Sequence, residues 1–220
     1  CFPAKIAGGH ILNLVEKGVD RIFYPMVRHD RDDYADSLNS YNCPVVTGYP
    51  QVVASSLDPQ GRFGIPYDHP PFSFKEARNA EAASVDYLAS LGVSRPDAKA
   101  AFQAAMAEWE RCRLALRQAG TQALADARAR GLLPLLVLGR PYHIDSLINH
   151  RIPEIMEGFG VLVLTEDSIP LPSHRKLGKL EVLTQWAFPN RFYEAAIWAA
   201  EQPDVEVVQL NSFGCGPDAL

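Results

Sequence analysis

The chain has 220 residues, of which 47% are hydrophobic and 21% charged, and its formal net charge is −5. This composition excludes a largely disordered chain, because it offers enough apolar surface to offset the entropy lost on ordering. The acidic balance argues against nucleic acid or an anionic membrane as the main partner, and the apolar runs fall short of the roughly 18 residues of a membrane span. We therefore expect a cytoplasmic protein. The chain opens on Cys1 rather than Met, so we expect a piece of a longer polypeptide, truncated at both ends.

Residues 1–70 have the pattern of a small α/β lobe. The apolar residues of segment 4–17 recur at helical spacing, and Gly18 follows as a residue that ends a helix. Segments 20–24 and 45–49 are short apolar runs, each followed by a proline, and both predict strands. A helix with two strands is the start of an α/β arrangement.

Two other parts of the first half are polar or rich in Pro, Gly and Asp. Residues 28–42 predict a surface loop, and residues 54–74 predict a connection. The middle segment, 71–131, is rich in alanine and nearly free of β-branched residues, which predicts helices. Between Pro96 and Gly120, a stripe with 3–4 spacing predicts the face that packs on a core. The stripe consists of Phe102, Met106, Trp109, Cys112, Arg113 and Leu116.

Residues 132–220 alternate between strand and helix patterns. The strand runs are 133–138, 161–165 and 205–210, and the helices between them are 149–159 and 190–201, the latter with Phe192, Ala195, Ala196 and Ala199 facing inward. Strands alternating with helices at this spacing predict a parallel sheet with right-handed crossovers. The fold class we expect is α/β, with Rossmann-like parallel sheets and an Ala-rich helical middle segment, in three parts: 1–70, 71–131 and 132–220.

Polar loops follow all three predicted strands of the last part. They are Gly139–Asp145, Glu166–Ser168 and Asn211–Asp218. Functional groups of open parallel sheets gather beyond the carboxyl ends of the strands, so these loops together favour a site at one sheet edge. Each loop taken alone is equally well explained by turn chemistry and helix capping.

The four cysteines divide into two kinds. Cys1, Cys43 and Cys215 lie in segments bounded by proline or glycine, which suits metal ligation, whereas Cys112 lies on the helical stripe and is expected in the core. No CxxC motif is present, so spacing alone leaves unrelated structural thiols as the stronger alternative.

The loop after the first strand of the last part holds further candidates. Arg140 and His143 suit anion binding, whereas a zinc site made of His143, Asp145 and His150 matches no common zinc spacing. The chain has no GxGxxG, GxxxxGK[ST] or GxSxG motif, so nothing favours a dinucleotide site, a P-loop or an α/β-hydrolase nucleophile.

Several long segments carry a family resemblance. They are 1–25, 41–50, 139–169 (which opens with GRPYHID), 183–196 and 209–219 (QLNSFGCGPDA). In this order they resemble the 2-hydroxyacyl-CoA dehydratase superfamily. The chain looks most like the branch of activase-related proteins that join an ATPase activator module to dehydratase-like modules.

The resemblance implies a 4Fe–4S cluster held by Cys1, Cys43 and Cys215. It also implies low-potential one-electron chemistry on an acyl-CoA substrate, in anaerobic metabolism, driven by an ATP-hydrolysing activator that would be the partner. The activity would be that of a lyase of the dehydratase type or of a component of an ATP-dependent reductase. Arg140, His143 and His150 are then the candidate catalytic residues, for binding CoA phosphates or donating to the cluster sulfurs.

Two alternatives stay open at this point. One is a non-catalytic electron-transfer or partner-binding module with the same cluster, and the other is a plain α/β scaffold with structural cysteines. Because Cys1 and Cys215 are close to the ends of the given chain, we expect the cluster to be lost from protein made in air. A dimer is compatible with every one of these hypotheses.

Overall fold

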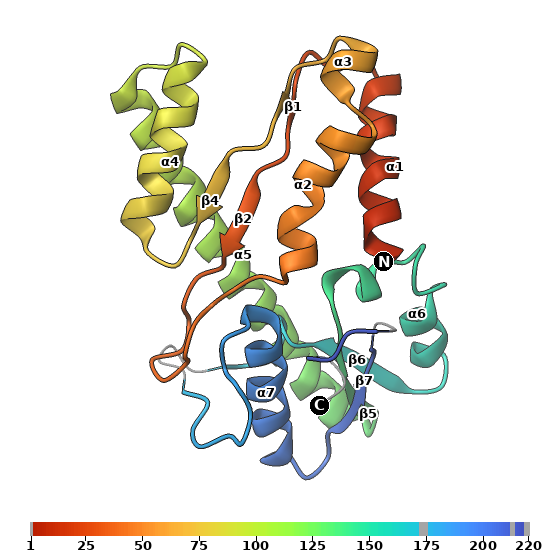
Figure 1. Ribbon diagram of the computed structural model, residues 1–220. Helices are drawn as coiled ribbons and strands as arrows, with labels where there is room; N and C mark the ends of the chain where they lie inside the picture. The colour runs from red at the N-terminus through yellow and green to blue at the C-terminus, as the bar shows by residue number, and fades with distance from the viewer. Residues whose placement is uncertain (1, 172–175, 212–213, 218–220) are drawn as a thin grey trace. The chain divides into compact units, whose positions relative to one another are not determined.

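The computed structural model describes residues 2–171, 176–211 and 214–217 (Figure 1). The chain divides into two compact units built from non-contiguous segments. Unit 1 comprises residues 1–32, 39–103 and 185–187, and unit 2 comprises residues 33–38, 104–184 and 188–220. Both units combine helices with short parallel strands, so the predicted α/β class is confirmed. The division into 1–70, 71–131 and 132–220 stays a prediction.

Unit 1 consists mainly of helices beside a narrow parallel ladder. Its helices are α1 (Phe2–Glu16), α2 (Pro44–Ser56), α3 (Pro59–Phe63) and α4 (Ala77–Ser90), together with the start of α5 (Arg95–Arg130). Strand β1 (Ile22–Phe23) pairs with β3 (Tyr67–Asp68), and β2 (Met26–His29) pairs with β4 (Pro71–Ser73). The core of this unit is formed by Ile11, Ile22, Val53 and Tyr67. The helix predicted over 4–17 is therefore confirmed as α1.

The ladder of unit 1 corrects the limits predicted for the first strand. Pairing does not end at Pro25, because the Met26 N–H donates to the Pro70 carbonyl over 2.9 Å and the ladder continues through His29. Prolines interrupt the ladder because they lack an N–H group, but they do not end it. The supposed loop 28–42 thus begins inside β2, and the supposed connection 54–74 contains α3, β3 and β4.

The strand predicted over 45–49 is wrong, because these residues lie in helix α2. Pro44 occupies the first helical turn, where a missing N–H group carries no penalty, and Cys43 is the N-cap. Tyr49, Pro50 and Val53 are the buried positions of this helix. The two adjacent valines favoured a strand, and the first-turn proline was the competing signal that decided the structure.

Unit 2 contains a three-stranded parallel sheet in the order β6-β5-β7. The strands are β5 (Leu133–Leu138), β6 (Val161–Thr165) and β7 (Glu206–Gln209), so all three predicted strands are confirmed. Helix α6 (Ile152–Glu157) and the 3-10 turn η1 (Pro141–Ile144) lie between β5 and β6, and α7 (Ala187–Ala200) lies between β6 and β7. The helix predicted over 149–159 is shorter at both ends.

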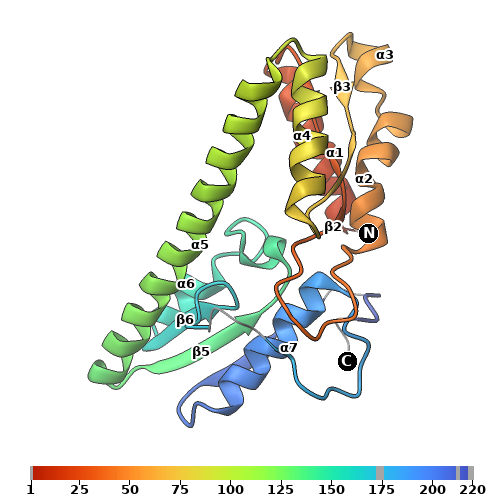
Figure 2. The ribbon, with the colours of Figure 1, turned by 90° about the vertical axis from the view of Figure 1, so that its left-hand side faces the viewer.

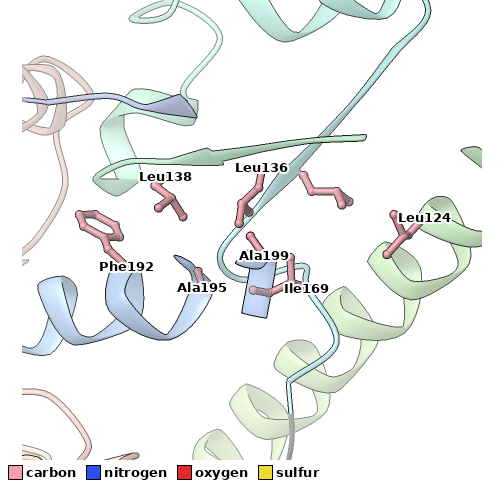
Figure 3. Packing of buried hydrophobic residues seen from close by; sticks show 8 residues of the cluster. Leu124, Leu136, Leu138, Ile169, Phe192, Ala195 and Ala199 are labelled. Carbon is pink, nitrogen blue, oxygen red and sulfur yellow. The ribbon is translucent and has the colours of Figure 1, made fainter. Parts of the chain in front are cut away.

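One face of this sheet packs on α7 (Figure 3). Leu136 and Leu138 of β5 point toward Phe192, Ala195 and Ala199 of α7. Leu164 of β6, Ile169 and Leu124 of α5 complete this core. Ala196 was predicted to face inward with its neighbours but is exposed, and Glu194 is buried instead.

Helix α5 is one continuous helix of 36 residues (Figure 2) and confirms that the middle segment is helical. Its buried positions include Ala98, Leu124 and Ala127. Cys112, however, is exposed, so its assignment to a core stripe is wrong. Trp109 and Leu116 of the same predicted stripe are also exposed, whereas Phe102, Met106 and Arg113 are half-buried. The guanidinium carbon of Arg113 lies 5.1 Å from the Trp109 ring centroid.

Candidate functional site

The strand order places a topological switch at the carboxyl ends of β5 and β7. From β5 the chain continues to β6 on one side, and from β6 it crosses to β7 on the other. Leu138 and Gln209 are paired at this edge, and the Leu210 N–H donates to the Leu138 carbonyl over 2.7 Å. Ligands of open α/β sheets bind outside the carboxyl ends of strands at such a switch. The loops after β5 and β7 thus emerge side by side, as predicted.

Arg140 and Cys215 meet at this edge. The Arg140 Nη2 atom lies 3.8 Å from the Cys215 Sγ atom, which is hydrogen-bond distance for sulfur. The same guanidinium stacks on Phe188 and Phe192, with its carbon 5.3 and 5.7 Å from the two ring centroids. Two aromatic faces hold the cation in place, and a cation beside a thiol favours the thiolate form that ligates metals.

His143 orients the backbone of the same loop. Its Nδ1 atom accepts a hydrogen bond from the Arg140 N–H over 3.0 Å, which assigns the ring proton to Nε2 when the imidazole is neutral. Gly139 makes room for this ring, since a Cβ atom there would lie 2.9 Å from Nδ1. His143 therefore helps to position Arg140.

His150 lies in the exposed turn before α6. It and Arg151 both have left-handed backbone angles, with φ of 54° and 61°, which non-glycine residues adopt rarely. The Asn149 side chain accepts the Arg151 N–H over 2.9 Å, and the Asp145 carboxylate accepts the N–H groups of Leu147 and Ile148. Asp145 thus stabilises the turn itself, as the alternative of turn chemistry and helix capping predicts for such loops.

The loop after β6 is one of the three polar loops predicted at this edge, and it contacts Arg191, which the sequence patterns did not indicate. Arg191 of α7 forms an ion pair with Asp167 and lies 4.0 Å from the Glu166 carboxylate. Its guanidinium carbon lies 4.9 Å from the Phe188 centroid, so Phe188 contacts both Arg191 and Arg140. Arg191 is the fifth residue of α7, the helix that follows β6, and from there it reaches the loop at the carboxyl edge of the sheet.

Glu166 is buried at this edge. Burial raises the pKa of its carboxyl to about 7, against the opposing effects of Arg191 and Arg140. A carboxyl group with this pKa exchanges its proton near neutral pH, which is the property of a general acid or base.

Cys43 belongs to unit 1 and is half-buried as the N-cap of α2. The Thr47 Oγ1 and Asn42 Nδ2 atoms both donate to the Val27 carbonyl, over 3.0 and 3.3 Å, and hold the turn around it. Cys1 lies outside the described residues, and the convergence of the three cysteines stays a prediction.

Within residues 2–171, 176–211 and 214–217, no three His, Cys, Asp or Glu side chains form a group that could hold a metal ion. The predicted ligand set of Cys1, Cys43 and Cys215 stays a prediction, because Cys1 lies outside these ranges. None of the helices in the described part of the chain is both long enough and apolar enough to cross a membrane.

The fold and the charged sheet edge define an α/β protein with an arginine-lined site beside a cysteine. The family model described as CoA enzyme activase uncharacterised domain matches residues 1–169, and the chain belongs to this family. No curated protein and no solved structure matches the chain. The match covers unit 1 except residues 185–187 and the part of unit 2 up to residue 169, which includes Arg140, His143 and Glu166.

Proposed function

We propose that the chain is the iron–sulfur module of a protein of the 2-hydroxyacyl-CoA dehydratase type. It would take part in low-potential one-electron chemistry on an acyl-CoA substrate, with an ATP-hydrolysing activator as its partner. Membership of a CoA enzyme activase family supports the link to CoA chemistry. The observation that carries the proposal is the contact between Arg140 and Cys215 at the switch point of the sheet.

Two of the three proposed cluster ligands lie in the described part of the chain. Cys43 and Cys215 are both half-buried, one at the amino end of a helix and the other beside a guanidinium. With Cys1 as the third ligand, they would hold the cluster, which supplies one-electron transfer and a Lewis-acidic iron when bound.

The other residues of the edge have separable roles in this proposal. Arg140 donates to the Cys215 sulfur, and His143 holds the Arg140 backbone through its Nδ1 atom. Glu166 holds a proton that it can exchange near pH 7. His150, exposed on the adjoining turn, is a candidate for binding a CoA phosphate.

Anaerobic reconstitution with iron and sulfide tests the proposal. Cys1→Ser, Cys43→Ser and Cys215→Ser should each lose most of the bound iron and the electron paramagnetic resonance signal of the reduced protein. Cys112→Ser is the matched control, because Cys112 is an exposed cysteine on α5, and it should keep both. Equal iron content in all four variants, or equal loss in all four, would contradict the ligand assignment.

Arg140→Gln tests the role of the guanidinium separately. Hydrogen bonds to cluster sulfurs stabilise the reduced, more negative state, so the variant should keep its iron but show a more negative midpoint potential. Arg128→Gln is the control, because Arg128 is half-exposed and paired with Asp204 at the amino end of the strands. An unchanged potential in Arg140→Gln would remove Arg140 from the cluster environment.

The alternative is a module that only transfers electrons or binds a partner. Turnover of a 2-hydroxyacyl-CoA by the reconstituted protein with activator and ATP would favour the lyase. Reduction of the cluster by the activator without turnover would favour the electron-transfer module.

A further inference from the structure

A register shift in the ladder of unit 1 brings a histidine opposite a serine. Val27 of β2 pairs with Phe72 of β4, and the next pair joins His29 to Ser73. The ladder thus skips Arg28, which would lie opposite Ser73 in a regular register. An extra residue of this kind, a β-bulge, re-aims the side chains around it, and such bulges are over-represented next to active sites.

The His29 and Ser73 side chains are in contact. The Ser73 Oγ atom lies 3.2 Å from the His29 Nδ1 atom, which is within hydrogen-bond distance. On another side the imidazole lies against the Tyr41 ring, with the two centroids 4.5 Å apart. The backbone of Tyr41 is itself held by the bonds to Gln185 and Ala187. The histidine ring is therefore fixed between a hydroxyl group and an aromatic face.

The surroundings of His29 favour its neutral form. Burial lowers the pKa of the imidazole, and the positive charges of Lys75 and Arg28 lower it further. The carboxylate of Asp30 accepts the N–H group of the residue that follows it, over 2.8 Å. At pH 7 the ring is therefore a neutral base, and in the tautomer with its proton on Nε2 it accepts the Ser73 hydroxyl at Nδ1.

Lys75 supplies a fixed positive charge near this pair. Its Nζ atom donates to the Asn39 Oδ1 atom over 2.9 Å, and its charge acts on His29. A preorganised cation stabilises the negative oxygen that develops when a hydroxyl group attacks a carbonyl carbon. A hydroxyl, a neutral base in contact with it and a nearby cation are together the parts that acyl transfer to a serine needs.

We propose that Ser73 accepts an acyl group from an activated ester, with His29 as its general base. The Ser73 Oγ atom bonds to the carbonyl carbon while its proton passes to the His29 Nδ1 atom. The bond from that carbon to the leaving thiol or alcohol then breaks, and the leaving group takes the proton from His29. The products are an ester on Ser73 and a free thiol or alcohol. The inference rests on the proposed function only where an acyl-CoA is the source of the acyl group.

An alkyl fluorophosphonate is the probe, because it mimics an activated ester and forms a stable bond to an activated serine as fluoride leaves. Trypsin releases residues 63–75, in which Ser73 is the only serine and cysteine is absent, so mass spectrometry of this peptide gives the labelling rate. We expect Ser73 to be labelled at least about tenfold faster than Ser90, an exposed serine of the same unit. Equal rates at the two serines would overturn the proposal.

Two histidine variants assign the effect to the base. His29→Gln should slow the labelling of Ser73 at least about tenfold, because it removes the base and keeps the hydroxyl. His69→Gln is the control and should label as wild type, because His69 lies against Tyr67, with the ring centroids 5.4 Å apart. A smaller effect of His29→Gln, or an equal effect of His69→Gln, would reduce the contact of His29 with Ser73 to a structural one.

The pH dependence of labelling in the wild-type chain needs no variant. His29 is already neutral at pH 7, so the rate should stay constant between pH 7 and pH 8. Attack that depends on hydroxide instead rises about tenfold over one pH unit. A rise of more than about twofold would therefore overturn the role of His29.

Two acyl donors, acetyl-CoA and p-nitrophenyl acetate, then distinguish the source of the acyl group. The readout is an acetyl group on residues 63–75, or release of CoA or nitrophenolate, that is lost in Ser73→Ala. Reaction with acetyl-CoA identifies a CoA thioester as the source, and reaction with the nitrophenyl ester alone identifies an oxygen ester. These measurements need no cluster. Absence of labelling in protein with normal iron content would reject only this inference, whereas labelling of protein that binds no iron would reject only the proposed function.

Discussion

Glu166 makes the stability of unit 2 depend on pH. Burial raises its pKa to about 7, so the folded state favours the protonated carboxyl while the unfolded chain ionises near its ordinary value. The stability that this group contributes is fully present below its ordinary pKa of 4.5 and is lost as the pH rises from there to about 7. The shift corresponds to roughly 3 kcal/mol between the two limits.

Glu166→Gln should therefore gain stability relative to wild type as the pH rises. We expect the difference in the free energy of unfolding between variant and wild type to increase by about 2–3 kcal/mol from pH 5 to pH 8. Urea denaturation at both pH values measures it. Glu157→Gln is the control at an exposed position, and a difference as large there would contradict the assignment to Glu166.

A buried pair far apart in sequence contributes to the same unit. The Tyr34 hydroxyl donates to the Glu194 Oε2 atom over 2.9 Å, and both side chains are buried. Tyr34→Phe removes the donor and leaves a buried carboxylate oxygen short of one bond, so we expect a loss of about 1–3 kcal/mol in the free energy of unfolding. Urea denaturation gives the value, with Tyr142→Phe at a half-buried position as comparison; a loss below about 0.5 kcal/mol would show that water replaces the hydroxyl.

Helix α5 approaches the loop after β6 so closely that only glycine fits at the contact. A Cβ atom at Gly120 would lie 1.9 Å from the Ser168 carbonyl oxygen, a backbone atom that cannot turn aside. Ser168 itself closes the loop, since its Oγ atom accepts the Thr165 N–H over 3.0 Å. The helix thus sets the position of the segment that carries Glu166.

Two glycine-to-alanine variants should therefore have opposite effects. Gly120→Ala should destabilise the protein by about 1–3 kcal/mol or more, because backbone must move. Gly48→Ala in α2 should stabilise it by about 0.5–1 kcal/mol, because a Cβ there meets nothing within 4 Å and alanine favours the helix. Chemical denaturation of both variants checks the contrast, and equal signs would contradict it.

Sequence patterns predicted elements well where periodicity was long or strands were fully apolar. The segments that became α1, β5 and β6 have such patterns, and the parallel pairing of β5 with β6 and β7 followed from the alternation with helices. The pattern misled at α2, where β-branched residues outweighed a first-turn proline in our interpretation. It also placed Cys112 in a core, because two neighbouring faces of a helix share the same spacing within a short window.

The sequence could predict that the candidate site lies at the carboxyl edge of the sheet, but not which side chains contact one another there. Loop positions after parallel strands led to Arg140 and to Cys215, which are in contact. Loop position indicated Glu166 in the same way, but neither its burial nor its approach to Arg191 of α7 follows from spacing.

At the scale of the molecule, each of the two units is built from several segments that are separated in the sequence. Residues 93–103 belong to unit 1 although they follow the exposed turn at Gly92, and residues 33–38 belong to unit 2 although they precede it. A cut at that turn therefore leaves each unit with pieces of both fragments. The Asp33–Arg113 ion pair at 2.9 Å, with both side chains about 20% exposed, joins the two fragments within unit 2.

A protease site inserted after Gly92 should thus yield a nicked protein that stays in one piece. We expect both fragments to elute together in gel filtration under native conditions and to separate only in denaturant. The uncut protein in the same buffer gives the reference elution volume. Separate elution in plain buffer would show that the contacts within each unit are too weak to hold the fragments.

The same threading has a consequence for synthesis on the ribosome. Tyr41 of unit 1 is bonded on both sides by the returning segment: its N–H donates to the Gln185 carbonyl over 3.0 Å, and its carbonyl accepts the Ala187 N–H over 2.9 Å. Residues 185–187 are translated some 80 residues after the rest of unit 1 is complete. Until then the two backbone groups of Tyr41 can bond only to water, so the Tyr41 amide should become protected from hydrogen exchange only after residue 187 has left the exit tunnel.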